Sequence, residues 1–279
     1  MAKLFYGHIK NNTHHMHYYR TGGVKPPLVL IHGLADSGLC WSRVALELEP
    51  EYDLIMVDLR GHGLSGGGDD ISALDASVSD IFELIQSLEL GKVILVGHSL
   101  GANIAALTAR RFPDMVLGLV LEDPPWFSDD TMGSAPDADA IAAGWIEHYK
   151  RWKSMSYEAL YGLLNKLQPA WDDDDKRQWI KAKQQLRREF INYVEPQPFN
   201  WKPVIATMKT RTLILAGNPD KGGLLSMEAI EVIHKQWKAA RIVAMPEAGH
   251  NVRRDDPQKY LGEMKNFLQG FPVKNGGFR

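Results

Sequence analysis

The chain has 279 residues, with 32 Lys and Arg against 34 Asp and Glu and a formal net charge of −2. A chain of this length buries a core without disulfides or metals, and its near-neutral charge argues against a nucleic-acid or membrane partner. The single cysteine, Cys40, excludes an internal disulfide and a thiolate metal site. The N-terminus lacks the apolar run of a signal peptide, and no run approaches the roughly 18 apolar residues that span a bilayer. We therefore expect a soluble, cytoplasmic protein.

Short apolar segments alternate along the chain with segments of helical periodicity. The first 25 residues are polar and aromatic with Asn and Gly turn signals, which predicts an antiparallel hairpin. Apolar residues at helical spacing predict crossover helices over 74–88 and 227–237. Strands are expected at the continuous apolar runs, at residues 28–31, 54–57, 93–96, 116–121, 213–216 and 242–245. This alternation is typical of a mostly parallel α/β sheet that is buried on both faces by helices.

The alternation stops after Pro124 and Pro125, and the next strand begins only near Thr212. Helices are expected in between, over 145–153, 157–166 and 174–193. We therefore divide the chain into a first core part, a helical cap and a second core part, at residues 1–124, 125–203 and 204–279. Aromatic side chains gather in the cap, and some should form an apolar substrate pocket or attach the cap to the core. The candidates for the pocket are Trp126, Trp145, Trp152 and Tyr161.

A serine nucleophile is indicated directly after the strand 93–96. The segment Gly97-His98-Ser99-Leu100-Gly101 is a G-x-S-x-G motif between a strand and a helical segment. This setting places the serine on a sharp turn above the sheet edge, and the flanking glycines let neighbouring backbone pass closely. Ser99 is therefore the candidate nucleophile.

A serine hydroxyl needs a general base close by. His250 follows the last strand, in a loop at the edge where open α/β sheets place their ligands. An imidazole that titrates near pH 6.5 suits this task. His234 falls inside an expected helix and is assigned a structural role. We therefore predict His250 as the base.

The base needs a carboxylate that orients it. Asp220 lies just past the strand 213–216, and the order Ser99, Asp220, His250 is the one expected for a triad on this sheet. Glu122 and Asp123 end the preceding strand, and a carboxylate from either strand end could reach the same histidine. We predict Asp220 as the acid and keep Asp123 and Glu122 as alternatives.

An oxyanion formed at Ser99 needs two N–H donors. The amide of Leu100 lies at the start of the helix after the nucleophile, where the helix dipole favours negative charge. The second donor is expected from the loop after strand 28–31, where the amide of Leu34 is the natural candidate. Nucleophile, base and donors are then all protein groups, so we expect neither a cofactor nor a metal.

These segments together resemble the α/β-hydrolase superfamily. The resemblance implies the α/β-hydrolase fold, a serine esterase-type activity and a helical cap inserted after the sixth strand. Epoxide hydrolases and haloalkane dehalogenases share this organisation but carry an aspartate nucleophile, so Ser99 argues against both. The resemblance rests on His32-Gly33, Asp58 to Ser65, Gly97 to Gly101, Asp220 and Ala248-Gly249-His250.

We therefore expect a hydrolase of carboxylic esters, with small to medium apolar or aromatic substrates and an acyl-enzyme intermediate. The same triad serves lactones, thioesters, amides and carbon–carbon bonds, and the sequence does not separate them. A ligand receptor with little turnover is the alternative from another class. The sequence leaves the oligomeric state open.

Overall fold

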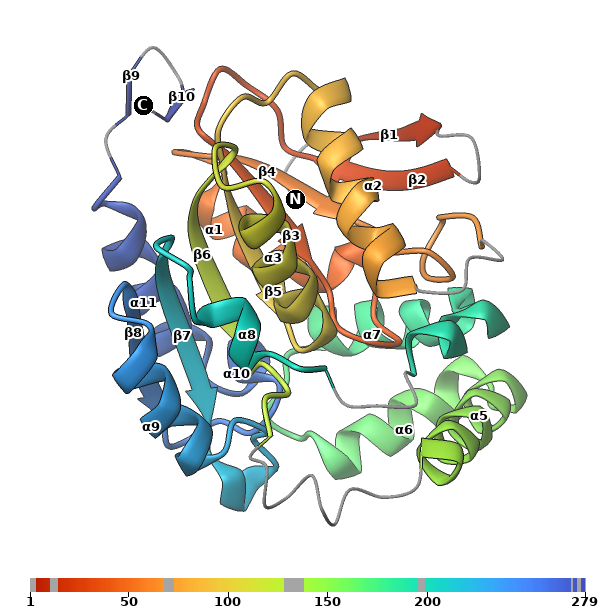
Figure 1. The fold of residues 1–279 in the computed structure, drawn as a ribbon. Coiled ribbons are helices and arrows are strands. Elements are labelled where there is room, and N and C mark those ends of the chain that lie inside the picture. Colours follow the sequence, from red (N-terminus) through yellow and green to blue (C-terminus); the bar gives the residue numbers. More distant parts are fainter. Residues whose placement is uncertain are drawn as a thin grey trace.

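The central sheet of the computed structural model has eight strands in the order β1-β2-β4-β3-β5-β6-β7-β8 (Figure 1). The structure describes residues 4–10, 15–67, 73–127, 138–194, 199–271, 273–274 and 277–278. The first two strands form the expected antiparallel hairpin, β2 is antiparallel to β4, and all later pairs are parallel. The strands are β1 (Phe5–Lys10), β2 (His15–Arg20), β3 (Pro27–Ile31), β4 (Asp53–Val57), β5 (Val93–His98), β6 (Val116–Glu122), β7 (Arg211–Gly217) and β8 (Ala240–Met245). A separate small ribbon pairs β9 (Val273–Lys274) with β10 (Gly277–Phe278).

The six strands expected from apolar runs are all present. Strands β3, β4 and β5 are buried at every position, because helices cover both faces of a parallel sheet. Strand β8 differs, since it is an edge strand and only Met245 among its residues is buried.

Helices cover the two faces of the sheet as separate layers (Figure 1). Helices α2, α3 and α9 bury apolar residues in one core cluster, while α1 and α11 do so in the other. The predicted crossover helices 74–88 and 227–237 correspond to α2 and α9. The helices outside residues 138–194 are η1 (Gly38–Trp41), α1 (Ser42–Leu48), α2 (Ala73–Ser87), α3 (Leu100–Arg111), α8 (Lys202–Ile205), η3 (Pro219–Lys221), α9 (Met227–Gln236), α10 (Val252–Asp255) and α11 (Pro257–Leu268).

Residues 138–194, between β6 and β7, are mostly helical and are called the insertion below. They lie across the carboxyl ends of the parallel strands (Figure 1). The insertion contains α5 (Ala138–Ser154), α6 (Tyr157–Leu167), α7 (Asp173–Gln185) and η2 (Arg188–Tyr193). The single helix expected over 174–193 is wrong, because Leu186 is extended with ψ 131° and separates α7 from η2. Residues 128–137 and 195–198 of the predicted cap lie outside the described residues, and the division into three parts stays a prediction.

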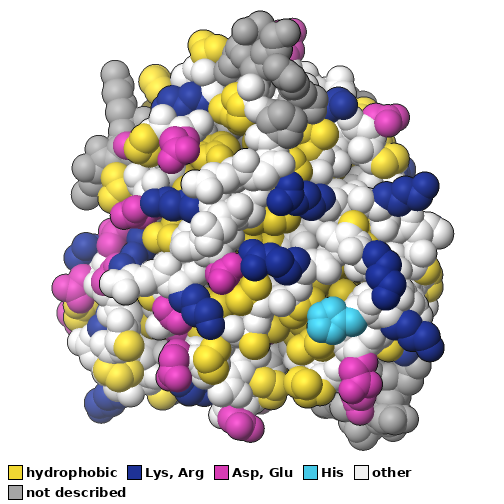
Figure 2. Space-filling model, turned by 90° about the vertical axis from the view of Figure 1, so that its left-hand side faces the viewer, with side chains coloured by type: hydrophobic (Ala, Val, Ile, Leu, Met, Phe, Trp, Pro, Cys, Tyr) yellow, Lys and Arg dark blue, Asp and Glu magenta, His cyan; other side chains and the backbone are white. Residues whose placement is uncertain are grey.

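The surface carries charges of both signs. Figure 2 shows the side of α9 and β8, where basic and acidic side chains are interspersed with small hydrophobic patches. This mixture agrees with the net charge of −2. None of the helices that the structure describes is both long and apolar enough to cross a lipid bilayer.

Candidate active site

Ser99 occupies the turn between β5 and α3. Its backbone has φ 52° and ψ −118°, in the left-handed half of conformational space that a serine rarely adopts. The turn needs glycine on both sides. A Cβ on Gly97 would lie 2.3 Å from the Gly101 carbonyl oxygen, and one on Gly101 would lie 2.2 Å from that of Ile31. Strain of this kind concentrates at functional sites, and here it holds Ser99 on the wall of a cavity.

His250 lines the same cavity and contacts a buried carboxylate. Its Nδ1 lies 2.6 Å from Oδ2 of Asp123, whose side chain is fully buried at the end of β6. Asp123 also accepts hydrogen bonds from the backbone N–H groups of Gly217 at 3.1 Å and Leu224 at 2.8 Å. A carboxylate with only N–H donors around it favours the His250 tautomer with its proton on Nδ1. The Nε2 atom is then left as a proton acceptor.

The carboxylate that the structure places against His250 is not the predicted one. Asp220 is exposed in η3, where its N–H bonds to Asn218 Oδ1 at 3.0 Å. The side chain that contacts His250 is instead that of Asp123, one of the two alternatives. The other, Glu122, has its carboxylate oxygens 3.0 and 3.1 Å from Arg253 Nη1. Strand β6 ends at Glu122, and the chain turns at Asp123 with a φ of 40°, so the two carboxylates contact different partners.

His98 supports His250 from the residue before the nucleophile. Its Nε2 donates to the His250 carbonyl oxygen at 2.9 Å. Burial lowers the pKa of His98 well below the usual range for histidine, which keeps this ring neutral. His98 thus fixes the backbone of the loop that carries His250, a contact between residues far apart in sequence that no local motif indicates.

Leu34 and Leu100, the two residues predicted to supply oxyanion donors, lie on the wall of the cavity that Ser99 also lines. Their role as oxyanion donors stays a prediction. Leu100 is the first residue of α3, where an N–H has no acceptor within its own helix. The loop that carries Leu34 is fixed by a hydrogen bond from the Ala35 N–H to His62 Nε2 at 3.0 Å. Its backbone turns at Ala35, which has a φ of 60°. Within the described part of the chain, neither amide has a hydrogen-bond acceptor.

The cavity measures about 660 Å³, within the range of small-molecule sites. Of the four aromatic residues expected in its wall, Trp145 and Trp152 line it. Trp126 does not, since it is fully buried against Trp201 in the main core and donates to Asn103 Oδ1 at 2.8 Å. Tyr161 does not either, because it packs among the helices of the insertion and its hydroxyl bonds to Asp173 at 2.7 Å. The remaining apolar wall comes from residues of the core and the insertion, among them Leu74, Phe127, Ile141, Phe199 and Leu224.

Two buried cations in the cavity wall were not foreseen from sequence. Lys183 of α7 and Arg254 of α10 both line it, and their side chains are 4% and 2% exposed. Burial by itself would raise the pKa of Asp36, but the charges of Arg254, Lys183 and Arg253 lower it to about 2. Asp36 is therefore an anion near these cations. From sequence alone, a lysine in a helix is expected to be exposed to solvent. Only the tertiary structure shows that Lys183 is buried in the cavity wall.

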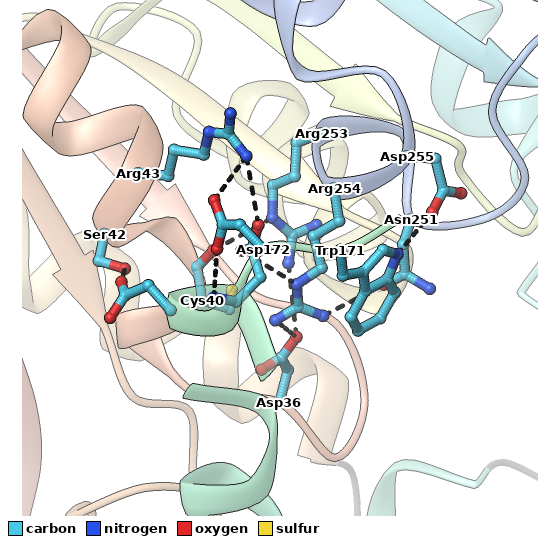
Figure 3. A network of polar contacts seen from close by, with 12 residues as sticks. Asp36, Cys40, Ser42, Arg43, Trp171, Asp172, Asn251, Arg253, Arg254 and Asp255 are labelled. Atoms are coloured by element: carbon cyan, nitrogen blue, oxygen red, sulfur yellow. Dashed lines mark hydrogen bonds and ion pairs between the residues drawn. The ribbon is translucent and has the colours of Figure 1, made fainter. Parts of the chain in front are cut away.

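A polar network joins the insertion to the core beside these cations (Figure 3). Arg43 of α1 lies 2.7 Å from Asp172, which caps the N-terminus of α7. The indole N–H of Trp171 donates to Asp255 of α10 at 2.7 Å, and the Arg254 guanidinium lies 4.8 Å from the centre of the same indole ring. These contacts fix α7, and with it Lys183, over the carboxyl ends of the strands. Within the described ranges, no group of three or more His, Cys, Asp or Glu side chains is arranged to hold a metal ion.

Comparisons with known proteins agree with this architecture. A family model described as "Alpha/beta hydrolase family" matches residues 28–263. N-formylmaleamate deformylase of Pseudomonas putida is 26% identical, over 94% of this chain and 96% of its own. Lipase LipV of Mycobacterium tuberculosis is 37% identical, over 44% of this chain and 49% of its own. The crystal structure of the N-formylmaleamic acid deformylase Nfo from Pseudomonas putida S16 superposes with a TM-score of 0.77 at 22% identity, covering 94% of this chain and 100% of that one.

The matched region includes the nucleophile turn, both strand ends that carry acidic residues, and the histidine loop. The eight-stranded sheet and the helices on its two faces are those of the same fold. The chain is a hydrolase that belongs to the alpha/beta hydrolase family.

Proposed function

We propose that this hydrolase cleaves carboxylic esters of small to medium apolar or aromatic substrates through Ser99, His250 and Asp123. One observation carries the proposal: a strained serine and a histidine line one cavity, and the histidine contacts a fully buried carboxylate at 2.6 Å. This arrangement of nucleophile, base and orienting acid is recognised by its geometry and by the role of each group.

The reaction proceeds through an acyl-enzyme. His250 Nε2 takes the proton of the Ser99 hydroxyl as its oxygen attacks the acyl carbon, and the amides of Leu34 and Leu100 bind the oxyanion. His250 then gives the proton to the leaving alkoxide, and the ester bond breaks. A water molecule, deprotonated by His250, attacks the acyl-enzyme and releases the acid and free Ser99. Asp123 stays ionised throughout and stabilises the imidazolium.

Amide hydrolysis is the second candidate, because a relative that matches over 96% of its own length is a deformylase of N-formylmaleamate. The same residues serve this reaction, since an amine leaves readily only when it is protonated and His250 supplies that proton. The lipase relative, by contrast, favours the ester. Lactones, thioesters and carbon–carbon bonds follow the same covalent route.

The test compares wild type and Ser99→Ala on p-nitrophenyl esters of increasing acyl length and on the matching p-nitroanilides. We expect turnover of short acyl chains by wild type and none above background by the variant, with circular dichroism showing that both are folded. Turnover retained in Ser99→Ala would refute the nucleophile. A folded wild type without turnover on any of these compounds would favour the receptor alternative.

A further inference from the structure

The Lys183 side chain reaches from α7 of the insertion to the loop that carries Leu34. Its Nζ donates to the Ala35 carbonyl oxygen at 2.5 Å. On the way it lies over the rings of Trp152 and Trp179, with Nζ 4.8 and 4.5 Å from their centres. Lys183 thus presents a buried positive charge to the cavity, directly beside the proposed oxyanion site.

This ammonium is less well paired than the other buried cations around it. Arg253 has Glu122 at 3.0 Å and Arg254 has Asp36 at 3.0 Å (the arginines are shown in Figure 3). An ammonium carries three N–H donors. For Lys183, one carbonyl acceptor and two ring faces are its partners within the described residues, and no carboxylate among them lies within ion-pair distance.

Keeping this charge costs the folded protein free energy. A buried cation without a full set of partners is unfavourable, and burial lowers the pKa of Lys183 to about 8, although Asp36 acts in the opposite direction. A carboxylate bound in the cavity would supply the missing partner, because charge-assisted hydrogen bonds between ammonium and carboxylate are among the strongest in proteins.

We propose that Lys183, together with Arg254, binds a carboxylate group of the substrate, so that the preferred substrates are short anionic esters or amides. This inference rests on the proposed function, because it assigns a substrate class to the same cavity. Ala35 follows Leu34 in the chain, and Arg254 comes four residues after His250. Both cations are therefore anchored to the loops of the reacting groups, and they line the same cavity as Ser99 and His250. This favours substrates whose carboxylate lies close to the bond that is cleaved.

A purely structural role predicts something different. If Lys183 only ties α7 to the loop at Ala35, its replacement would lower the turnover of charged and neutral substrates in parallel. Lys183→Gln removes the charge and keeps a donor for the Ala35 carbonyl, while Lys183→Met removes both. Lys181→Met is the matched control, because Lys181 lies on the same helix with an exposed side chain.

The substrate pair is mono-p-nitrophenyl succinate and p-nitrophenyl butyrate, which have the same acyl length and differ in a terminal carboxylate against a methyl group. We expect the ratio of their kcat/KM values, succinate over butyrate, to fall about ten- to hundredfold in Lys183→Met and Lys183→Gln, the worth of a charged hydrogen bond. Lys181→Met should keep the wild-type ratio. An unchanged ratio in both Lys183 variants would overturn the proposal.

A binding measurement separates this inference from the proposed function. Succinate is titrated calorimetrically into Ser99→Ala and into Ser99→Ala with Lys183→Gln. Lys183-dependent binding of succinate without Ser99-dependent turnover of either ester supports the carboxylate site and refutes the proposed function. If turnover depends on Ser99 but succinate binds equally well with and without the Lys183 side chain, the carboxylate site is refuted and the proposed function stands.

Discussion

Replacing Asp123 by Asn tests the site at the point where sequence and structure differ. The change keeps the size and shape of the side chain and removes its negative charge. Asp123 is fully buried, and three N–H donors point at its two oxygens: Gly217 at one, and Leu224 and His250 at the other. An Asn side chain has one oxygen and one NH₂ group, so in either orientation its NH₂ meets at least one of these donors.

The expected magnitudes follow from this count. Leaving one or two buried N–H groups without an acceptor costs about 1–3 kcal/mol of the free energy of unfolding. The effect on turnover is larger, because the NH₂ group favours the wrong imidazole tautomer and the imidazolium loses its counter-charge. The corresponding change in a serine protease triad lowers kcat about 10⁴-fold, which is roughly 5 kcal/mol in the activation free energy.

The assay uses p-nitrophenyl butyrate and measures kcat and KM for wild type, Asp123→Asn and Asp220→Asn. Asp220 gives a control of identical chemistry, since its side chain is exposed and belongs to the short helix η3. We expect Asp220→Asn to keep the wild-type kcat and to shift unfolding in urea by no more than about 0.5 kcal/mol. A severe loss in Asp220→Asn with a mild one in Asp123→Asn would refute the geometry described here.

Two further predictions concern stability. Gly101→Ala should lower the free energy of unfolding by about 3 kcal/mol, because the new Cβ would lie 2.2 Å from a backbone oxygen of β3. Gly162 is exposed in α6, and a Cβ added there would have no atom within 4 Å, so Gly162→Ala should raise the free energy of unfolding by about 0.5–1 kcal/mol. Equal changes for the two variants in urea unfolding would contradict the packing at Gly101. Burial lowers the pKa of Lys183 from 10.5 to about 8. Between these two pH values Lys183 binds more protons in the unfolded state than in the folded state, so the free energy of unfolding rises with pH. The unfolding free energy of wild type relative to Lys183→Met should therefore increase by about 3 kcal/mol from pH 8 to pH 10.5, and a difference independent of pH would show that Lys183 is not buried as a cation.

Much of the fold follows from local sequence patterns. Six continuous apolar runs coincide with strands. For all of them except the edge strand β8 the reason is burial, because a strand buried on both faces of a parallel sheet must be apolar at successive positions. The nucleophile turn is equally local, since only glycine allows the backbone approaches seen at Gly97 and Gly101. His250 was predicted as the base from its place after the last long strand, and the structure places it in the same cavity as Ser99. In each case the property that decides the structure is carried by residues close together in the chain.

Tertiary structure alone decides which carboxylate contacts His250 and which cations line the cavity. Asp123 and Asp220 both follow strands that end at the same edge of the sheet, so chain order does not separate them. The distance of 2.6 Å between Asp123 Oδ2 and His250 Nδ1 distinguishes them. The φ of 40° at Asp123 is a second feature that the sequence does not reveal. Lys183 looks like any helical lysine until α7 packs over the strands and buries it. Partners far apart in sequence are selected by packing, whereas strands and tight turns are selected by the residues within them.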